Sequence, residues 1–359
     1  MNDRKTITVA PWGRGPGGRP ARLYTLDDGA GVRAQLTDHG ATVVSLRAPD
    51  REGRAADVVL GFDALDGYLQ PGQPYLGAMV GRHANRIAAG RFTLDGRQHR
   101  LACNSGGQHL HGGRRGFDRV VWQSEVREGE GGAQLLLRHV SADGDEGYPG
   151  RLEVELPCTL AAGALRLECS ARCDAPTIVN LTSHMYFNLA GQGDVLGHEL
   201  QILAARFTPV DASLIPTGEL REVQGSPMDF RRPRRVGERL DLADEQLRHA
   251  GGYDHNWVLD GPAGTLRPVA RLREPASGRT MEVLTTQPGL QFYSGNFLDG
   301  RLAGRGGVRY ARHAGLCLET QHFPDSPNHP HFPSTRLAPG EEYRQVTVYR
   351  FGTDAAAGG

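Results

Sequence analysis

Several polar stretches of the chain carry side chains that could bind or protonate a small polar ligand. Each stretch combines amide, imidazole, guanidinium or carboxylate groups with neighbouring aromatic residues. This mixture suits a sugar, because sugar hydroxyls form paired hydrogen bonds with polar groups and the C–H faces of the ring pack on aromatic side chains. The stretches are residues 81–92, 104–113, 180–189, 253–257, 289–296 and 317–325.

A metal centre is the first alternative, because the chain has 14 histidines. A strand through His109 and His111 would place both rings on one face, and zinc sites use that spacing. No cysteine or carboxylate pattern of matching spacing accompanies this pair. We therefore expect a site without a metal.

The titratable residues of these stretches also have structural interpretations. Glu319 has apolar neighbours, so it could be a buried carboxylate paired with an arginine. His184 could be a hydrogen-bonded core histidine. Asp254 could cap a turn, and Arg86 could belong to a structural ion pair. The residue pattern alone leaves structural and functional roles open.

We expect β-strands to position most of the polar side chains of these stretches. Period-two alternation of apolar and polar residues, which is typical of half-buried strands, marks residues 152–156, 164–169 and 343–351. Residues 120–126 and 134–140 flank a turn-rich segment at 128–132, as in a hairpin. Helical periodicity is confined to residues 64–69 and about 236–249. Many strands with almost no helix favour an antiparallel sandwich or barrel.

Composition excludes several classes of partner. The 41 basic and 41 acidic side chains give a net charge of zero, so neither nucleic acid nor an anionic membrane surface is expected as a partner. The first residues lack the apolar core of a secretory signal, and no apolar run approaches the roughly 18 residues of a membrane span. Five cysteines, an odd number in a long chain, indicate reduced thiols. We expect a cytoplasmic protein, either a monomer or a homodimer.

The polar stretches, taken in order along the chain, resemble the aldose 1-epimerase (galactose mutarotase) family from about Tyr24 to Phe351. Residues 143–150 and 207–218 extend the resemblance, and the agreement of all stretches in register makes it specific. It implies an all-β fold, a large antiparallel β-sandwich of the galactose mutarotase type, with the site on one concave sheet. It also implies one domain over residues 1–359, with a core at about 22–351 and short loose ends.

The resemblance assigns roles residue by residue. Glu319 matches the general base, His184 matches the general acid, and His111 matches a second histidine beside the ring oxygen. Tyr186 matches a residue that lines the site, and the sugar-hydroxyl contacts match Asn85, Arg86, Asp254 and Gln291. Four residues beside the key ones differ from the commoner family residues and bear on substrate preference only: Ser183, Met185, Tyr253 and Trp257.

The implied reaction is cofactor-free interconversion of the α and β anomers of free hexoses such as galactose and glucose. Opening a hemiacetal ring removes the proton on O1 and delivers one to the ring oxygen O5, so it needs a base and an acid. Glu319 as a carboxylate and His184 as an imidazolium would supply these groups. The carboxylate favours the protonated imidazole, while burial opposes both charges.

Three other functions compete with this interpretation. An epimerase of hexose 6-phosphates would need a basic cluster, for which Arg114, Arg115 and residues 231–235 are the candidates. A non-catalytic sugar-binding module could keep the pocket without the chemistry. A glycoside hydrolase would need two carboxylates, whereas the motifs supply one carboxylate and two histidines.

Overall fold

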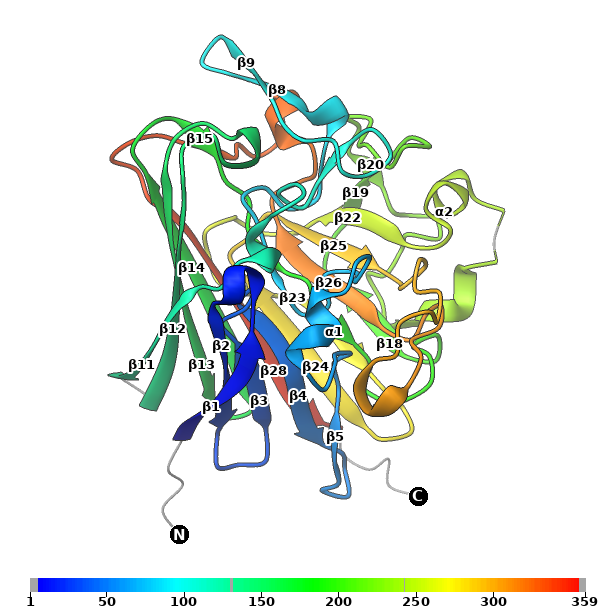
Figure 1. Cartoon of the computed structure of the whole chain (residues 1–359). Coiled ribbons are helices and arrows are strands. Elements are labelled where there is room, and N and C mark those ends of the chain that lie inside the picture. The colour runs from blue at the N-terminus through cyan, green and yellow to red at the C-terminus, as the bar shows by residue number, and fades with distance from the viewer. Residues whose placement is uncertain (1–5, 130–131, 242, 355–359) are drawn as a thin grey trace.

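Antiparallel sheets form the framework of the described part of the chain, residues 6–129, 132–241 and 243–354 of a computed structural model (Figure 1). The three largest sheets contain nine, six and five strands. The α-helices of these residues are short: α1 (Leu65–Leu69) and α2 (Glu245–Ala250). The predicted all-β sandwich is confirmed.

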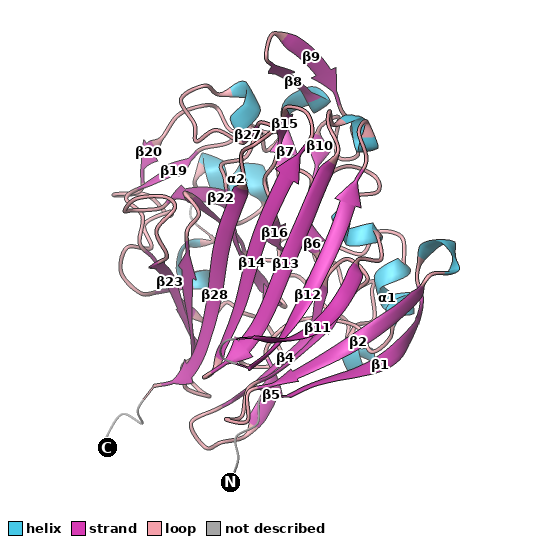
Figure 2. Cartoon of the chain, turned by 90° about the vertical axis from the view of Figure 1, so that its left-hand side faces the viewer, coloured by secondary structure: helices cyan, strands magenta, loops and turns pink. Residues whose placement is uncertain are grey.

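The nine-stranded sheet has one face toward the core and one toward solvent, and its long strands face the viewer in Figure 2. In β13 (Leu152–Ala161) the apolar residues Leu152, Val154 and Leu156 are buried, whereas Glu153 and Glu155 are exposed. This alternation is what made the strand predictable from sequence. On one side of β13 lie β12 (Gly132–Ser141) and then the edge strand β11 (Gln123–Gly129). On its other side follow, in order, β14 (Ala164–Cys173), β28 (Tyr343–Thr353), β24 (Arg279–Thr285), β23 (Arg267–Arg273), β18 (Glu199–Ile202) and β21 (Arg234–Arg235).

The six-stranded sheet is covered on both faces in its centre. All residues of β26 (Leu316–Gln321) and β25 (Gly289–Tyr293) are buried. One face contributes Phe292 and Leu318 to the main apolar core, and the other carries polar side chains. The remaining strands are β17 (Tyr186–Phe187), β22 (Asp254–Val258), β19 (Arg206–Thr208) and β20 (Arg221–Glu222).

A five-stranded sheet and several short strand pairs complete the framework. The main core joins residues of all three large sheets, for example Leu36, Leu137 and Phe292. The five-stranded sheet contains β1 (Thr6–Arg14), β2 (Pro20–Asp27), β3 (Arg33–Thr37), β4 (Thr42–Pro49) and β5 (Ala55–Asp57). The pairs are β6 (Met79–Val80) with β16 (Thr182–Ser183), β7 (Arg86–Ile87) with β10 (His109–Leu110), β8 (Arg91–Leu94) with β9 (Arg97–Arg100), and β15 (Thr177–Ile178) with β27 (Arg336–Leu337).

The hairpin and the second helix predicted from sequence differ in outcome. The hairpin is confirmed as β11 and β12, although residues 130–131 of its turn lie outside the described residues. The predicted helix over 236–249 is wrong as a single element, because a 3₁₀ turn (Val236–Arg239) and α2 are separate. Asp244 starts α2 by accepting the N–H groups of Gln246 and Leu247, at 2.8 and 3.2 Å.

None of the helices in the described ranges has the length and apolar character needed to cross a bilayer. The five cysteines are free thiols. Residues 355–359 of the expected C-terminal tail lie outside the described residues.

Candidate active site

Glu319 lies on the polar face of the six-stranded sheet. In the antiparallel register it is paired with Gln291, which is paired in turn with Asn256. Directly paired residues point to the same face of a sheet, so these three polar side chains form one row. The adjacent row, two residues along each strand, contains Asp254, Tyr293, Cys317 and Tyr186.

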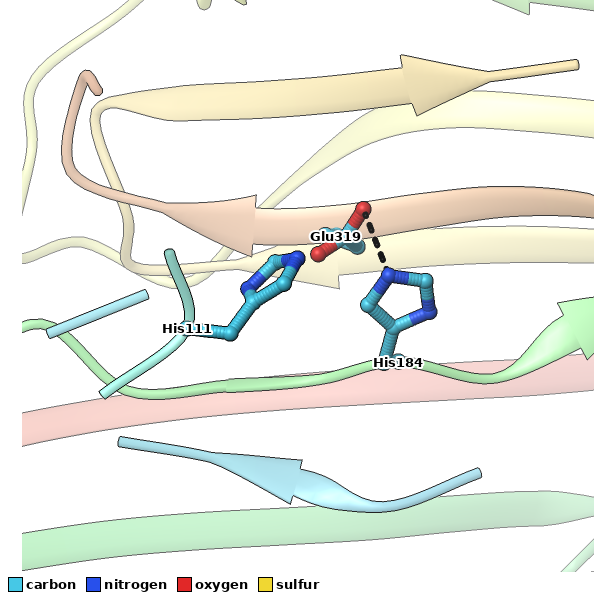
Figure 3. A group of neighbouring side chains, drawn as sticks. All are labelled: His111, His184 and Glu319. Atoms are coloured by element: carbon cyan, nitrogen blue, oxygen red, sulfur yellow. Dashed lines mark ion pairs between the residues drawn. The ribbon is translucent and has the colours of Figure 1, made fainter. Parts of the chain in front are cut away.

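Two histidines approach this face from segments outside the sheet. His184 follows β16, and its backbone N–H donates to the carbonyl of Ala78 at 2.9 Å. His111 follows β10, and its N–H donates to the carbonyl of Asn85 at 3.0 Å. Figure 3 shows both rings directed toward the Glu319 carboxylate, and Nε2 of His184 lies 3.8 Å from Oε1. Residues distant in sequence therefore meet at one point.

A pocket of about 140 Å³ opens onto this group. The residues predicted from sequence that line it are Asn85, Arg86, His111, His184, Tyr186, Asp254 and Glu319. Gln291 does not line the pocket. Its side chain is buried and donates to Oδ1 of Asp254 at 2.7 Å, and its expected contact with a sugar hydroxyl stays a prediction.

Charge within the pocket is partly balanced. Nη1 of Arg86 lies 3.6 Å from Oδ2 of Asp254, and both side chains retain some exposure to the pocket. Asp254 thus has an arginine on one oxygen and a glutamine on the other. The two groups are held in fixed orientations while they keep hydrogen-bonding capacity for a ligand.

Among the described residues, no arginine forms the ion pair with Glu319 that a structural role would require. Glu319 is 2% exposed, and its Oε2 has no hydrogen-bond partner among the described residues. A buried carboxylate oxygen without a partner is costly unless a ligand supplies one. Burial, followed by the negative charge of Asp254, raises the pKa of Glu319 well above its usual range, although Arg86 opposes this shift.

Burial also decides the protonation state of both histidines. It lowers the pKa of His184 to about 4, and it lowers the pKa of His111 well below its usual value. The effect of burial on the pKa of His184 therefore outweighs the attraction between an imidazolium and a carboxylate. At neutral pH both rings are neutral, and burial favours the protonated form of the Glu319 carboxyl.

His109 and His111 do not share a site, contrary to the strand interpretation. The strand ends at Leu110, and His111 adopts a left-handed backbone conformation with φ of 51°, so period-two alternation no longer applies. His109 instead contacts the carbonyl of Ala102 at 2.8 Å and the hydroxyl of Tyr148 at 2.5 Å.

The three central side chains are close enough to be compared with a metal site. One donor atom from each of His111, His184 and Glu319 lies within 4.8 Å of the others. However, Nδ1 of the neutral His111 accepts the backbone N–H of Asn85 at 3.2 Å, so Nε2 carries the ring proton. A histidine that binds a metal through one ring nitrogen usually donates a hydrogen bond from its other ring nitrogen, whereas Nδ1 of His111 accepts one. The donor set therefore fits hydrogen bonding to a ligand better than it fits a metal ion.

Several pocket residues were not singled out from sequence: Pro74, Tyr75, Leu110, Tyr293 and Phe297. Tyr293 lies two residues after Gln291 on β25, so strand alternation offered a signal for it. Tyr75 lies in a loop, and its ring centroid is 4.7 Å from that of His111 and 5.8 Å from that of His184. Nothing in the local sequence indicated that contact.

A larger cavity of about 480 Å³ contains none of the predicted residues. It lies between β5 and the loops around 188–194 and 305–314. Its Arg305 is paired with Asp57 at 2.5 Å. The smaller pocket is therefore the candidate active site.

Comparison with known proteins gives a consistent result over nearly the whole chain. The family described as aldose 1-epimerase matches residues 22–350. The galactose mutarotase of Bos taurus is 51% identical over 322 residues, or 89% of this chain and 91% of that protein. The galactose mutarotase of Homo sapiens is 47% identical over 349 residues, or 96% and 98%. The crystal structure of galactose 1-epimerase from Lactobacillus acidophilus NCFM has a TM-score of 0.86 at 27% identity, covering 98% of this chain and 100% of that chain.

Proposed function

The chain belongs to the aldose 1-epimerase family and is an isomerase of the mutarotase type, and from this premise we propose that it interconverts the α and β anomers of free hexoses such as galactose and glucose. Glu319 acts as the base at O1, and His184 acts as the acid at O5. The observation that carries this assignment is the unpartnered, buried Oε2 of Glu319 in a pocket shared with two histidines.

Glu319 and His184 share a single proton in the proposed reaction. Before a sugar binds we assign that proton to Glu319, because burial favours the uncharged form of both groups. Hydroxyl groups of a bound sugar solvate the carboxylate, and the proton passes to His184, whose Nε2 is 3.8 Å away. Glu319 then takes the O1 proton while His184 protonates O5, and the C1–O5 bond breaks to give the open aldehyde. Rotation about C1–C2 and the reverse transfers close the ring on the other face.

The remaining residues hold the sugar while C1 turns. Arg86, Asn85 and Asp254 bind hydroxyls, and Tyr186 packs against the ring. Gln291 orients Asp254 through its 2.7 Å hydrogen bond. His111 donates from Nε2 to the ring oxygen region, since its Nδ1 is occupied by Asn85. These contacts keep the open aldehyde from escaping before it recloses.

The domain organisation, the cellular location and the oligomeric state are inferred from features outside the pocket. We infer that residues 1–359 act as one domain, because a continuous apolar core extends from Tyr24 to Phe351. The free cysteines support a cytoplasmic location. A monomer and a homodimer are both compatible with the site, since every group in the proposed reaction comes from one chain.

Substrate class provides a direct test of the reaction. We expect free galactose and glucose to reach anomeric equilibrium faster with the protein, because Asn85, Arg86 and Asp254 can bind a C4 hydroxyl of either configuration. Methyl galactoside should not react, because it has no proton on O1. Galactose 6-phosphate should react more slowly, since Arg86 is the one arginine or lysine that lines the pocket among the described residues, and it already pairs with Asp254.

The assay compares initial polarimetric rates for galactose, galactose 6-phosphate and methyl galactoside, after the rate in buffer alone is subtracted. Release of methanol from the glycoside would identify a hydrolase and contradict the proposal. A preference for the phosphate ester would favour the hexose 6-phosphate epimerase. Binding of galactose without any acceleration would indicate a sugar-binding module.

Metal independence is a second expected result. Dialysis against a strong chelator should leave the polarimetric rate unchanged, because the Asn85 N–H keeps the ring proton of His111 on the nitrogen that a metal would need. The matched control is protein dialysed against buffer alone. Loss of the rate on chelation and its recovery with Zn²⁺ would show that His111, His184 and Glu319 form a metal centre.

A further inference from the structure

Phe297 is an exposed aromatic residue on the wall of the candidate active site. It is 60% exposed, whereas the tyrosines that line the same pocket, Tyr75, Tyr186 and Tyr293, are buried or half-buried. An aromatic ring in such a pocket can pack against the C–H groups of a sugar while polar neighbours bind its hydroxyls. The proposed proton transfers do not involve Phe297, so a role of this ring lies in binding.

The ring of Phe297 is held in one position by its neighbours. Asn296 is buried, and its side-chain amide donates to two backbone carbonyls at 3.0 and 2.8 Å. Leu298, on the other side, is also buried. The backbone N–H of Phe297 donates to the hydroxyl of Tyr293 at 2.7 Å, and the two rings stack with centroids 5.9 Å apart. A ring fixed in this way loses little conformational freedom when a ligand packs against it.

Phe297 ends a row of aromatic side chains that begins beside the proposed acid. The ring of Tyr186 stacks on that of His184 with centroids 5.1 Å apart. Tyr293 makes an edge contact with Tyr186, with ring centroids 5.9 Å apart, and Phe297 stacks on Tyr293. The row thus leads from His184 to the exposed rim of the pocket.

The direction of this row indicates which end of a sugar it can contact. In the six-stranded sheet both tyrosines of the row are paired with Cys317, whose Sγ lies 3.5 Å from Nδ1 of His184. Glu319 lies instead at the other ring nitrogen, with Oε1 3.8 Å from Nε2. The proposed function places O1 at Glu319 and O5 at His184. The ring carbon on the far side of O5 from C1 is C5, which carries C6 in a hexose, so the row extends toward C6.

We propose that Phe297 is a specificity-determining residue whose ring packs against the CH2 group at C6 of a bound hexose. The proposal rests on the proposed function, because the positions of O1 and O5 define where C6 lies. L-Arabinose has the configuration of galactose at C2, C3 and C4 but lacks C6, so this contact favours galactose over L-arabinose. Ring opening leaves C6 unchanged, so the contact stabilises the ground state and the transition state alike and acts on KM, not on kcat.

The kinetic test compares galactose with L-arabinose in Phe297→Ala. The KM for galactose should rise about threefold to tenfold, as expected for the loss of one buried CH2 contact, while kcat should stay near the wild-type value. The KM for L-arabinose should change by less than about twofold, because this sugar lacks the group that the ring contacts. Phe297→Tyr keeps the ring and should restore the wild-type KM for galactose. The values come from initial polarimetric rates over a range of sugar concentrations.

Val308→Ala is the matched control, because Val308 is 58% exposed and lines the larger cavity and not the candidate active site. It should keep the wild-type KM for both sugars. Because Phe297 is also largely exposed, Phe297→Ala should keep the fold, which its thermal unfolding midpoint checks. An unchanged KM for galactose in Phe297→Ala, or an equal rise for both sugars, would overturn the proposal.

Calorimetric binding of the two sugars separates this result from a failure of the proposed function. If the protein binds galactose without accelerating its mutarotation, the proposed function fails. The ratio of the two dissociation constants, compared between the wild type and Phe297→Ala, then still tests the contact at C6. Loss of the preference for galactose in the variant would support the contact, and an unchanged ratio would refute it.

Discussion

Glu319→Gln is expected to abolish catalysed mutarotation while galactose binding largely survives. The substitution keeps the size of the side chain but removes the group that takes the O1 proton. Acid–base groups contribute about 10²–10⁴-fold to such reactions, so the initial polarimetric rate should fall by at least about 10². Because Oε2 of Glu319 has no hydrogen-bond partner among the described residues, the amide replaces no existing protein contact on that side.

The control for this variant is Asp38→Asn. Asp38 is another buried carboxyl whose pKa is raised by burial, and it does not line the pocket. We expect its rate to stay within about twofold of the wild type. Galactose binding by Glu319→Gln, measured calorimetrically, separates a lost base from a lost fold. A Glu319→Gln rate above about a tenth of the wild-type rate would show that another group is the base.

The sheets differed in how far they could be predicted from sequence, for a physical reason. In the nine-stranded sheet one face meets water, so strands such as β13 alternate between buried leucine or valine and exposed glutamate. In the six-stranded sheet both faces are covered, and every residue of β26 is buried. Period-two alternation disappears there, so Glu319 was found through its polar stretch, and its role as base was indicated by the family resemblance alone.

The site was predicted in composition but not in arrangement. The polar stretches contain nine of the twelve pocket residues, because their mixture of amide, imidazole and carboxylate groups is unusual for loops. The hydrogen bond of Gln291 to Asp254 depends on strand register, and the contact of Tyr75 with His111 depends on a loop path. Neither is encoded in local spacing. The protonation states depend on depth of burial, which sequence does not report.

His184→Gln is the second variant with a large expected effect. Removing the acid should lower the polarimetric rate by about 10² or more, because O5 would have to leave without a proton. The amide occupies a similar volume, so the pocket lined by Tyr186 and Tyr75 should persist and galactose binding should remain. The remaining activity would come from Glu319 acting alone as a base.

The pH dependence distinguishes this loss from a structural one. In the wild type the pair needs one proton, so kcat/KM should fall at alkaline pH, when the last proton leaves the Glu319–His184 pair. In His184→Gln only the carboxylate is active. Since the pKa of Glu319 is raised by burial, its carboxylate population, and with it the residual rate, should increase with pH over the same range. If kcat/KM of His184→Gln still fell at alkaline pH, the acid would be another group, with His111 as the next candidate.

The double variant Glu319→Gln, His184→Gln extends this test to the coupling between the two residues. Both side chains serve a single proton relay, so once one is absent the other contributes much less than it does in the wild type. We expect the double variant to be no more than about tenfold slower than the slower single variant. Independent roles would instead multiply the two losses, giving a rate about 10⁴-fold or more below the wild type. That outcome would contradict a shared proton and, with it, the mechanism proposed for this pocket.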